Sequence, residues 1–266
     1  MDDVLRRLVR QHGPRPWKCH GKALDVLVEA MLAQNTSMHN AAEGYRRLRR
    51  DLPTWSRVMA APVEQVQRGI AICGLSRMRA RRLQALLRRI QEERGRLTLE
   101  WLGRLAPGKA YAYLMSFHGV GPKTAAYTLL FAFNMPLFPV DGGIVRLARR
   151  LRIVPARGSE RRIVQAIERA TAERPDRRYP LHVLMFRHAK TVCRPRNPRC
   201  DECRLLAICP TGQLRIRKLP PPKPELPYRK RRPPLAWRMS DGLNKGSDDA
   251  PSARGRVVRA IPLRGS

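Results

Sequence analysis

Acidic residues are scarce in this chain of 266 residues, which has 21 Asp and Glu against 54 Lys and Arg. The net charge is +33 and the sequence pI is near 11.5. So large a surplus of positive charge indicates that the chain binds a polyanion and not an acidic small molecule. Nucleic acid is the first candidate and an anionic membrane surface the second. A genome bias toward arginine codons does not explain the shortage of acids.

The chain also lacks a long hydrophobic run. Its longest stretch without a charged residue, 124–140, has 17 residues and is interrupted by one asparagine and two prolines, whereas a membrane span needs ~20 apolar residues. The N-terminal segment has no continuous apolar stretch followed by a small-residue cleavage site, so no export signal is predicted. We therefore exclude an integral membrane protein and expect an intracellular chain of the cytoplasm or nucleoid.

Lysine is scarce as well, since 45 of the 54 basic residues are arginine and only Lys109, Lys123 and Lys190 occur between residues 24 and 211. Arginine stays protonated in proteins, whereas a lysine with a lowered pKa can react as an amine nucleophile. A lysine inside a motif of this chain is therefore informative.

Strand patterns are absent, and helical periodicity dominates. Apolar residues recur at helical spacing over 24–32, 83–90 and 181–188. We expect an all-α fold, with the arginines between residues 79 and 89 largely on the outer sides of the second helix. His188 lies on the apolar face of the third helix, which is typical of a core histidine with its hydrogen bonds satisfied.

Composition changes near residue 211. Residues 212–266 contain nine prolines and 14 Lys and Arg against four Asp and Glu, so this segment carries +10 and residues 1–211 carry +23. The segment is too poor in apolar residues to offset the entropy of ordering, so we expect a mostly disordered, basic, Pro-rich tail. It either adds nonspecific, salt-sensitive affinity for a polyanion or binds a protein partner.

Four cysteines lie within 17 residues with the spacing C-x6-C-x2-C-x5-C. They are Cys193, Cys200, Cys203 and Cys209. In a reducing compartment such a set is more typical of metal ligands than of disulfides, and it suits a tetrahedral zinc or an iron-sulfur cluster. Zinc sites more often have two C-x2-C arms, so this spacing favours iron-sulfur. The other two, Cys19 and Cys73, are expected to be ordinary buried thiols.

Three arginines, Arg194, Arg196 and Arg199, lie between the first two of these cysteines. A loop tied at both ends by metal would hold their guanidinium groups in place for contact with successive phosphates. The alternative is a solvated basic loop.

A glycine hairpin follows residue 115, where SFHGVGPKTAAYTLLFAF predicts a helix end, a tight turn and a new helix. Gly119 and Gly121 permit positive φ and a close backbone approach, and Pro122 suits the first position of the new helix. Amides at that helix start can hold a phosphate. G-V-G followed by Pro-Lys-Thr-Ala is specific for a helix-hairpin-helix DNA-binding element.

These features together resemble the endonuclease III branch of the helix-hairpin-helix (HhH-GPD) DNA glycosylases. The matching pieces are LAQNTS at 32–37, GLSRMRA at 74–80, HGVGPKTA at 118–125, PVDGGIVRLARR at 139–150 and the four cysteines. They occur in the family's order. The resemblance implies a monomer that binds damaged double-stranded DNA in a cleft between two helical domains. A six-helix domain of residues 22–132 carries the hairpin, and residues 1–21 with 133–211 form a domain with a 4Fe-4S cluster.

Lys123 and Asp141 match the family's nucleophile and carboxylate. Breaking an N-glycosidic bond builds positive charge at C1′, which a carboxylate stabilises, and an amine can capture the sugar as a Schiff base whose C2′ proton becomes acidic. We expect desolvation at a helix N-terminus to lower the pKa of Lys123, and Asp141 to cap the next helix and face the same cleft. The alternatives are a phosphate-contacting lysine and a plain N-cap.

The resemblance also implies the DNA contacts. Gln34 matches the polar residue that fills the space left by an extruded nucleotide, and Leu75 matches an apolar wedge. Gly119, Gly121 and Thr124 belong to the hairpin, and His118 replaces its common proline. The alternatives are a polar helix end for Gln34, a core contact for Leu75 and an exposed turn residue for His118.

Two departures from the family's pattern leave the chemistry open. Gly142 and Gly143 follow Asp141 where the family has Thr-His, which removes hydrogen bonds and adds backbone freedom. Ala30 stands where the adenine-removing relatives have a catalytic glutamate, and the adjacent Glu29 could line the pocket instead.

Three hypotheses follow. The first is a glycosylase and apurinic/apyrimidinic (AP) lyase for oxidised pyrimidines, which uses a lysine Schiff base. The second is a monofunctional glycosylase for alkylated or mismatched bases, in which Asp141 activates water. The third is a catalytically weak iron-sulfur DNA-binding protein.

Overall fold

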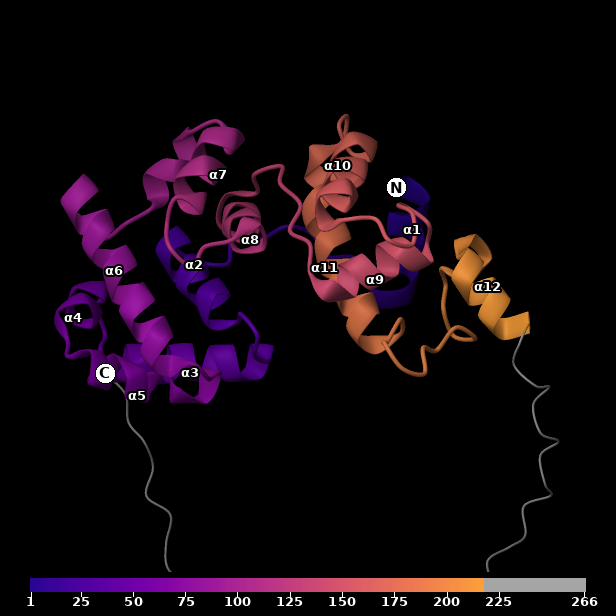
Figure 1. Cartoon of the computed structure of the whole chain (residues 1–266). Helices are drawn as coiled ribbons and strands as arrows, with labels where there is room; N and C mark the ends of the chain where they lie inside the picture. Colours follow the sequence, from indigo (N-terminus) through magenta and orange to yellow (C-terminus); the bar gives the residue numbers. More distant parts are fainter. Residues whose placement is uncertain (218–266) are drawn as a thin grey trace, which may run out of the picture. The chain divides into compact units, whose positions relative to one another are not determined.

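The computed structural model describes residues 1–217, and these form helices and loops with no strand among them (Figure 1). The all-α prediction is thereby confirmed for this part of the chain. The α-helices are α1 (Asp2–His12), α2 (Ala23–Leu32), α3 (Met38–Asp51), α4 (Trp55–Ala60), α5 (Val63–Gly69), α6 (Ser76–Arg94), α7 (Pro107–Met115), α8 (Pro122–Phe133), α9 (Gly142–Arg150), α10 (Glu160–Ala170), α11 (Arg178–Thr191) and α12 (Pro210–Arg217). Short 3-10 helices are η1 (Ala71–Cys73), η2 (Glu100–Arg104), η3 (Pro175–Arg177) and η4 (Leu206–Ile208).

The three helices predicted from apolar spacing are α2, α6 and α11. Local signals also fix several helix starts, because Ser37, Thr54 and Ser159 each accept a hydrogen bond from a backbone amide of the helix that they cap. The arginines of α6 lie largely on its outer sides, as expected, because Arg81 and Arg88 are exposed and Arg82 and Arg89 are partly exposed. Arg79 is the exception and is buried.

Buried side chains form two hydrophobic clusters, and all described residues belong to one compact unit. The first cluster contains side chains of residues 23–135 and Tyr179. In it α2 packs against α8, and α4 and α5 pack against α6. The second cluster contains side chains of α1 and of residues 138–209. In it α1 and α9 pack against α11. The domain boundaries implied by the resemblance stay a prediction. Residues 22–133 hold seven α-helices, one more than it implied, of which two are short.

Polar bonds join the elements of the two clusters. The Trp17 indole N–H donates to the Leu130 carbonyl at 3.1 Å, and the His20 ring and the Tyr179 hydroxyl lie 2.7 Å apart. The Arg178 guanidinium donates to the Pro136 carbonyl. The segment between α1 and α2 is therefore anchored to both α8 and α11.

The boundary of the predicted tail is corrected at its start, because α12 includes residues 212–217. Proline at its first position and a hydrogen bond from Gln213 N to Cys209 O explain why a helix begins there. The rest of the predicted tail, 218–266, lies outside the described residues. None of the described helices is long and apolar enough to cross a membrane.

Candidate functional site

The glycine hairpin has one glycine in the left-handed region, not two. Gly119 has φ +86°, but Gly121 has φ −97° and is the extended N-cap of α8, so positive φ is required only at Gly119. A Cβ at Gly119 would lie 3.0 Å from Cδ of Arg82, so a close approach also requires glycine there. Pro122 occupies the first turn of α8 as predicted.

Lys123 is the second residue of α8, and its side chain is exposed. The burial that we expected around this amine is therefore not observed in the free protein. The next residue, Thr124, is buried, and its hydroxyl accepts a hydrogen bond from Nε2 of Gln34 at 3.1 Å. The predicted hairpin contacts Gly119 and Thr124 thus both bond to Gln34, whose Nε2 also donates to the Gly119 carbonyl at 2.9 Å.

Asp141 is the N-cap of α9, as predicted. Its Oδ1 accepts a hydrogen bond from the Ile144 amide at 2.7 Å. The two glycines after it differ. A Cβ at Gly143 would lie 3.0 Å from Cβ of Ala189 and 3.2 Å from Oδ1 of Asp141, whereas a Cβ at Gly142 would meet nothing within 4 Å. The lack of a side chain at Gly143 therefore permits α9 to pack closely on α11, whereas the space beside Gly142 is open.

His182 of α11 lies within electrostatic range of both Lys123 and Asp141. Its Nδ1 is 2.9 Å from the Pro139 carbonyl, which can only accept, so Nδ1 carries the proton. The side chain is 4% exposed, and burial lowers its pKa to about 4. The Pro139 hydrogen bond and the Asp141 carboxylate oppose that shift, and the Lys123 ammonium adds to it.

No motif in the sequence marks His182 as a functional residue. Its one signal is that it lies in a helix with an apolar face, next to Leu181. The ring contacts aromatic side chains from α8, α11 and the segment before α9, which are Tyr127, Phe131, Phe138 and Phe186.

A pocket of about 220 Å³ opens beside Lys123, and we call it the central pocket. Its walls come from α2, α3, α8 and α11 and are mostly alanine, aromatic and other apolar side chains. The lining residues are Glu29, Ala30, Ala33, Gln34, Met38, Ala41, Ala42, Lys123, Thr124, Tyr127, Phe131, His182, Val183 and Phe186. Glu29 thus lines this pocket, and desolvation together with the nearby Asp25 carboxylate raises its pKa.

Leu75 is 63% exposed, so the alternative that it makes a core contact is wrong. Its backbone is in the left-handed region with φ +48°, which is a strained conformation for leucine. Met78, one turn further along α6, is 39% exposed. Two large apolar side chains therefore project into solvent at the start of α6.

Arg79 ties the turn that carries Gln34 to the turn that carries Leu75. Its Nε donates to the Gly74 carbonyl at 2.8 Å, and one terminal nitrogen donates to the Met31 carbonyl at 2.7 Å. The other terminal nitrogen donates to the carbonyl of Gln34 itself. The sequence gives no sign of this role, because nothing in the spacing distinguishes Arg79 from the neighbouring arginines of α6.

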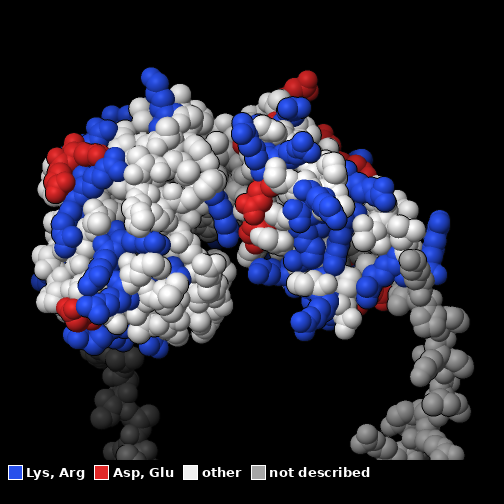
Figure 2. Space-filling view, in the orientation of Figure 1, with Lys and Arg blue, Asp and Glu red and all other residues white. Residues whose placement is uncertain are grey.

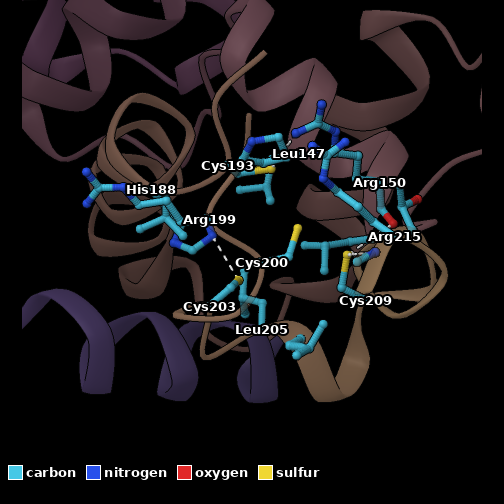
Figure 3. Close-up of a pocket in the computed structure, with 16 residues that line it drawn as sticks. Leu147, Arg150, His188, Cys193, Arg199, Cys200, Cys203, Leu205, Cys209 and Arg215 are labelled. Carbon is cyan, nitrogen blue, oxygen red and sulfur yellow. Dashed lines mark hydrogen bonds between the residues drawn. The ribbon is translucent and has the colours of Figure 1, made fainter. Parts of the chain in front are cut away.

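The four clustered cysteines line one cavity of about 120 Å³ (Figure 3). This volume is several times the ~30 Å³ share of a water molecule in the liquid. Within residues 1–217, no three His, Cys, Asp or Glu side chains lie close enough together to hold a single metal ion. Burial raises the pKa of the Cys203 thiol to about 11 and also raises those of Cys200 and Cys209.

Nitrogen groups lie beside three of the four sulfur atoms. Arg150 approaches Sγ of Cys193 at 3.2 Å, and the Gly212 amide donates to Sγ of Cys209 at 3.3 Å. His188 is fully buried, with Nε2 at 3.5 Å from Sγ of Cys203. Its Nδ1 lies 3.0 Å from Nε2 of His12, so both ring nitrogens have partners, as predicted for a core histidine. Of the remaining cysteines, Cys73 is buried but Cys19 is exposed, contrary to expectation.

The basic loop between Cys193 and Cys200 is fixed by α9. Terminal nitrogens of Arg150 donate to the carbonyls of Arg194 at 2.9 Å and Pro195 at 3.3 Å. Of the three predicted phosphate contacts, Arg196 and Arg199 are exposed, whereas Arg194 is half-buried and donates to the Asn197 carbonyl within the loop. Only two of them thus present exposed guanidinium groups.

The arrangement of helices is shared with two solved structures. A non-covalent endonuclease III–DNA complex has a TM-score of 0.69 at 22% identity and covers 80% of this chain and 95% of its own. A thermostable thymine-DNA glycosylase has a TM-score of 0.66 at 17% identity and covers 80% of this chain and 94% of its own. The likeness to both structures shows a common fold.

Sequence comparison leads to the same group of proteins. Endonuclease III of Bacillus subtilis is 31% identical over 160 residues, which span 60% of this chain and 68% of the relative. The DNA glycosylase/AP lyase ROS1 of Arabidopsis thaliana is 30% identical over 174 residues, which span 60% of this chain but only 12% of ROS1. The family model for HhH-GPD superfamily base excision DNA repair proteins matches residues 28–173, more than half of the chain. The chain therefore belongs to the HhH-GPD superfamily of base excision DNA repair proteins.

Proposed function

We propose that this protein is a DNA glycosylase that removes oxidised pyrimidines from duplex DNA and then cleaves the strand as an AP lyase. The observation that carries the proposal is the position of Lys123. It borders an apolar pocket of about 220 Å³ that His182 also lines, and this buried histidine lies within electrostatic range of both Lys123 and Asp141. A pocket, an amine and a carboxylate are the three parts that this chemistry requires.

The substrate nucleotide has to leave the base stack to reach the pocket. Leu75 is exposed and held in a strained backbone conformation, which suits a wedge between bases. Gln34 borders the central pocket, so its side chain is positioned to take the vacated space once its two bonds to the hairpin are released. Arg79 holds the backbone of both turns while these side chains move.

The base departs with the electron pair of the glycosidic bond, and positive charge develops at C1′ of the sugar. Oδ1 of Asp141 is occupied by the Ile144 amide, and within the described residues no group donates to Oδ2. Oδ2 is thus available to stabilise that charge. The cap hydrogen bond fixes the carboxylate before the substrate arrives.

The ammonium group of Lys123 gives up a proton, which balances the negative charge of the departing base, and Nζ forms a bond to C1′. The nitrogen then passes a second proton to O4′ as the C1′–O4′ bond breaks, which gives a Schiff base whose C2′ proton is acidic. Removal of that proton expels the 3′ phosphate and cleaves the strand. Because Lys123 is exposed in the free protein, the desolvation that favours its neutral amine has to come from bound DNA.

His182 orients the carboxylate without contacting the sugar. Its Nδ1–H holds the Pro139 carbonyl, two residues before Asp141. Gly142 and Gly143 offer no side chain for this task, and the hydrogen bond from His182 supplies a restraint on the same turn. It is therefore a positioning residue in this proposal.

We also propose that Cys193, Cys200, Cys203 and Cys209 hold a 4Fe-4S cluster. A shared cavity of about 120 Å³ suits a polynuclear group better than one ion, and nitrogen groups beside three sulfurs suit thiolate ligands. The cluster would supply cross-links that organise the basic loop. Anaerobically purified protein should contain about four iron atoms per chain by the four-thiolate argument, and one zinc atom per chain would contradict the assignment.

One observation favours a second candidate function. Lys123 is exposed, as a phosphate-binding lysine would be. In that case the protein is a monofunctional glycosylase, Asp141 activates water, and no covalent adduct forms.

An excision assay on a panel of damaged duplexes tests the proposal. Wild type should release an oxidised pyrimidine and cut the strand. Lys123→Gln should abolish cutting, while Lys109→Gln, which removes an exposed lysine on the neighbouring helix α7, should leave it intact. Base release without cutting by wild type would support the second candidate, and release that survives Asp141→Asn would remove the carboxylate from both.

A further inference from the structure

A groove of about 730 Å³ runs between α6 and the hairpin, apart from the central pocket. We call it the arginine groove because four of the ten residues that line it are arginines. The four arginines are Arg77, Arg81, Arg82 and Arg89 of α6, and the hairpin contributes His118. None of the ten lines the central pocket, so the groove is a separate site from the one proposed for the extruded base.

The cations of this groove have few partners within the described residues. Arg89 pairs with Glu93 at 2.7 Å, donates to the Ser116 carbonyl at 2.8 Å and lies over the Phe117 ring. Arg77, Arg81 and Arg82 make no ion pair or side-chain hydrogen bond in this part of the chain. Arg89 is therefore fixed as a wall, and the other three guanidinium groups are available to a ligand.

The sequence of α6 concentrates positive charge without local compensation. Its acidic residues, Glu92 and Glu93, come only near its end. Arg77 and Arg81 are four residues apart, so like charges lie next to each other on one side of the helix, which destabilises it. Figure 2 shows Lys and Arg side chains over the region that α6 occupies in Figure 1. An anion in the groove would relieve this repulsion.

The groove is continuous with the hairpin. His118 is one of its lining residues, and Cδ of Arg82 comes so close to Gly119 that a Cβ there would lie 3.0 Å away. From Arg77 to Arg89 the helix rises about 18 Å, enough to lie along several phosphates of one DNA strand. Met78, Ala85, Leu86 and Phe117 give the groove an apolar floor, which suits the sugars between those phosphates.

We propose that the arginine groove binds the phosphate backbone of the duplex outside the nucleotide that enters the central pocket, so that one arm of the duplex is held more tightly than the other. The inference rests on the proposed function in taking duplex DNA as the substrate. It adds a contact that acts on binding and not on bond cleavage.

The test measures affinity for a duplex that carries a reduced abasic site, at several salt concentrations. The groove variant is Arg77→Gln with Arg81→Gln. Its matched control is Arg57→Gln with Arg68→Gln, which removes the same charge from exposed positions on α4 and α5. The slope of log affinity against log salt should fall by about 1 for each groove arginine removed and by less in the control. Equal slopes would overturn the proposal.

A second experiment shortens the duplex from one end and then from the other. Wild type should lose affinity when one particular arm is shortened, and the groove variant should not respond further to that shortening, because the two changes remove the same contact. If shortening that arm weakens binding as much in the groove variant as in wild type, the two changes remove different contacts and the proposal is overturned. Equal duplex binding by both variants, with polyglutamate binding lost only in the groove variant, would instead indicate an acidic protein partner and also overturn it.

These outcomes are separable from those of the proposed function. All substitutions lie on exposed faces, and thermal unfolding of the two variants should be alike. If no base is released from any substrate but the salt slope and the arm dependence change as expected, the groove assignment stands while the proposed function fails. If base release is normal and neither changes, the proposed function stands and the groove assignment fails.

Discussion

The Nδ1–H of His182 donates a hydrogen bond to the carbonyl of Pro139, 2.9 Å away. This bond spans 43 residues of sequence and fixes the backbone just before Asp141. His182→Phe keeps a ring but loses the donor, so the single-turnover rate of base release should fall by about 10- to 100-fold with little change in KM. His182→Asn places an amide N–H where Nδ1 stands and should recover part of the rate. Equal rates in both variants would contradict this role.

The same histidine makes stability depend on pH. Burial lowers its pKa to about 4, against 6.5 for the unperturbed group. The unfolded chain therefore binds this proton more tightly, and the folded state loses stability as the pH falls from 6.5 toward 4, by up to roughly 3 kcal/mol. Urea unfolding at pH 7, 6 and 5 should show that loss in wild type and a weaker pH dependence in His182→Phe. Parallel pH profiles for the two proteins would exclude His182 as the source.

Arg79 is a buried cation whose three nitrogen groups all bond to carbonyls of the turns near Gln34 and Leu75. Arg79→Leu leaves those carbonyls without a donor, so the free energy of unfolding should fall by about 2 to 5 kcal/mol. Binding to a duplex with a reduced abasic site should weaken as well. Arg88→Leu is the control, since it removes an exposed arginine from the same helix and should change stability by less than about 0.5 kcal/mol. Similar losses in the two variants would count against the bonding role.

Gly143 and Gly142 are adjacent but unequal. An alanine at 143 would place its Cβ 3.2 Å from Oδ1 of Asp141 and 3.0 Å from Ala189, so the carboxylate and α9 have to shift. Gly143→Ala should therefore slow base release. Gly142→Ala meets no neighbour within 4 Å and should be neutral or stabilising by up to ~1 kcal/mol, because alanine favours a helix. Full activity in Gly143→Ala would show that the close packing at Asp141 has no part in the chemistry.

Features that depend on neighbouring residues could be predicted from the sequence. The helices α2, α6 and α11 follow from apolar spacing within each segment, and the cap at Asp141 follows from an aspartate at a helix start. The start of α8 follows in the same way from Pro122. In each case the partner atoms lie within about one helical turn.

Features that depend on distant partners could not be predicted. His182 and Arg79 bond to carbonyls more than 40 residues away, and both look like ordinary members of a helix in the sequence. The exposure of Lys123 depends on how α8 lies against its neighbours, which no local pattern encodes. The need for glycine at 143 arises only because α11 brings Ala189 within 3.0 Å of the Cβ position.

Borohydride trapping on duplex DNA with an abasic site tests the central claim most directly, since reduction makes the Schiff base permanent. Wild type should give a covalent protein–DNA adduct, Lys123→Gln should give none, and the exposed-lysine control Lys109→Gln should give as much as wild type. An adduct that persists in Lys123→Gln would place the nucleophile elsewhere. No adduct from wild type that still releases a damaged base would contradict the lysine mechanism.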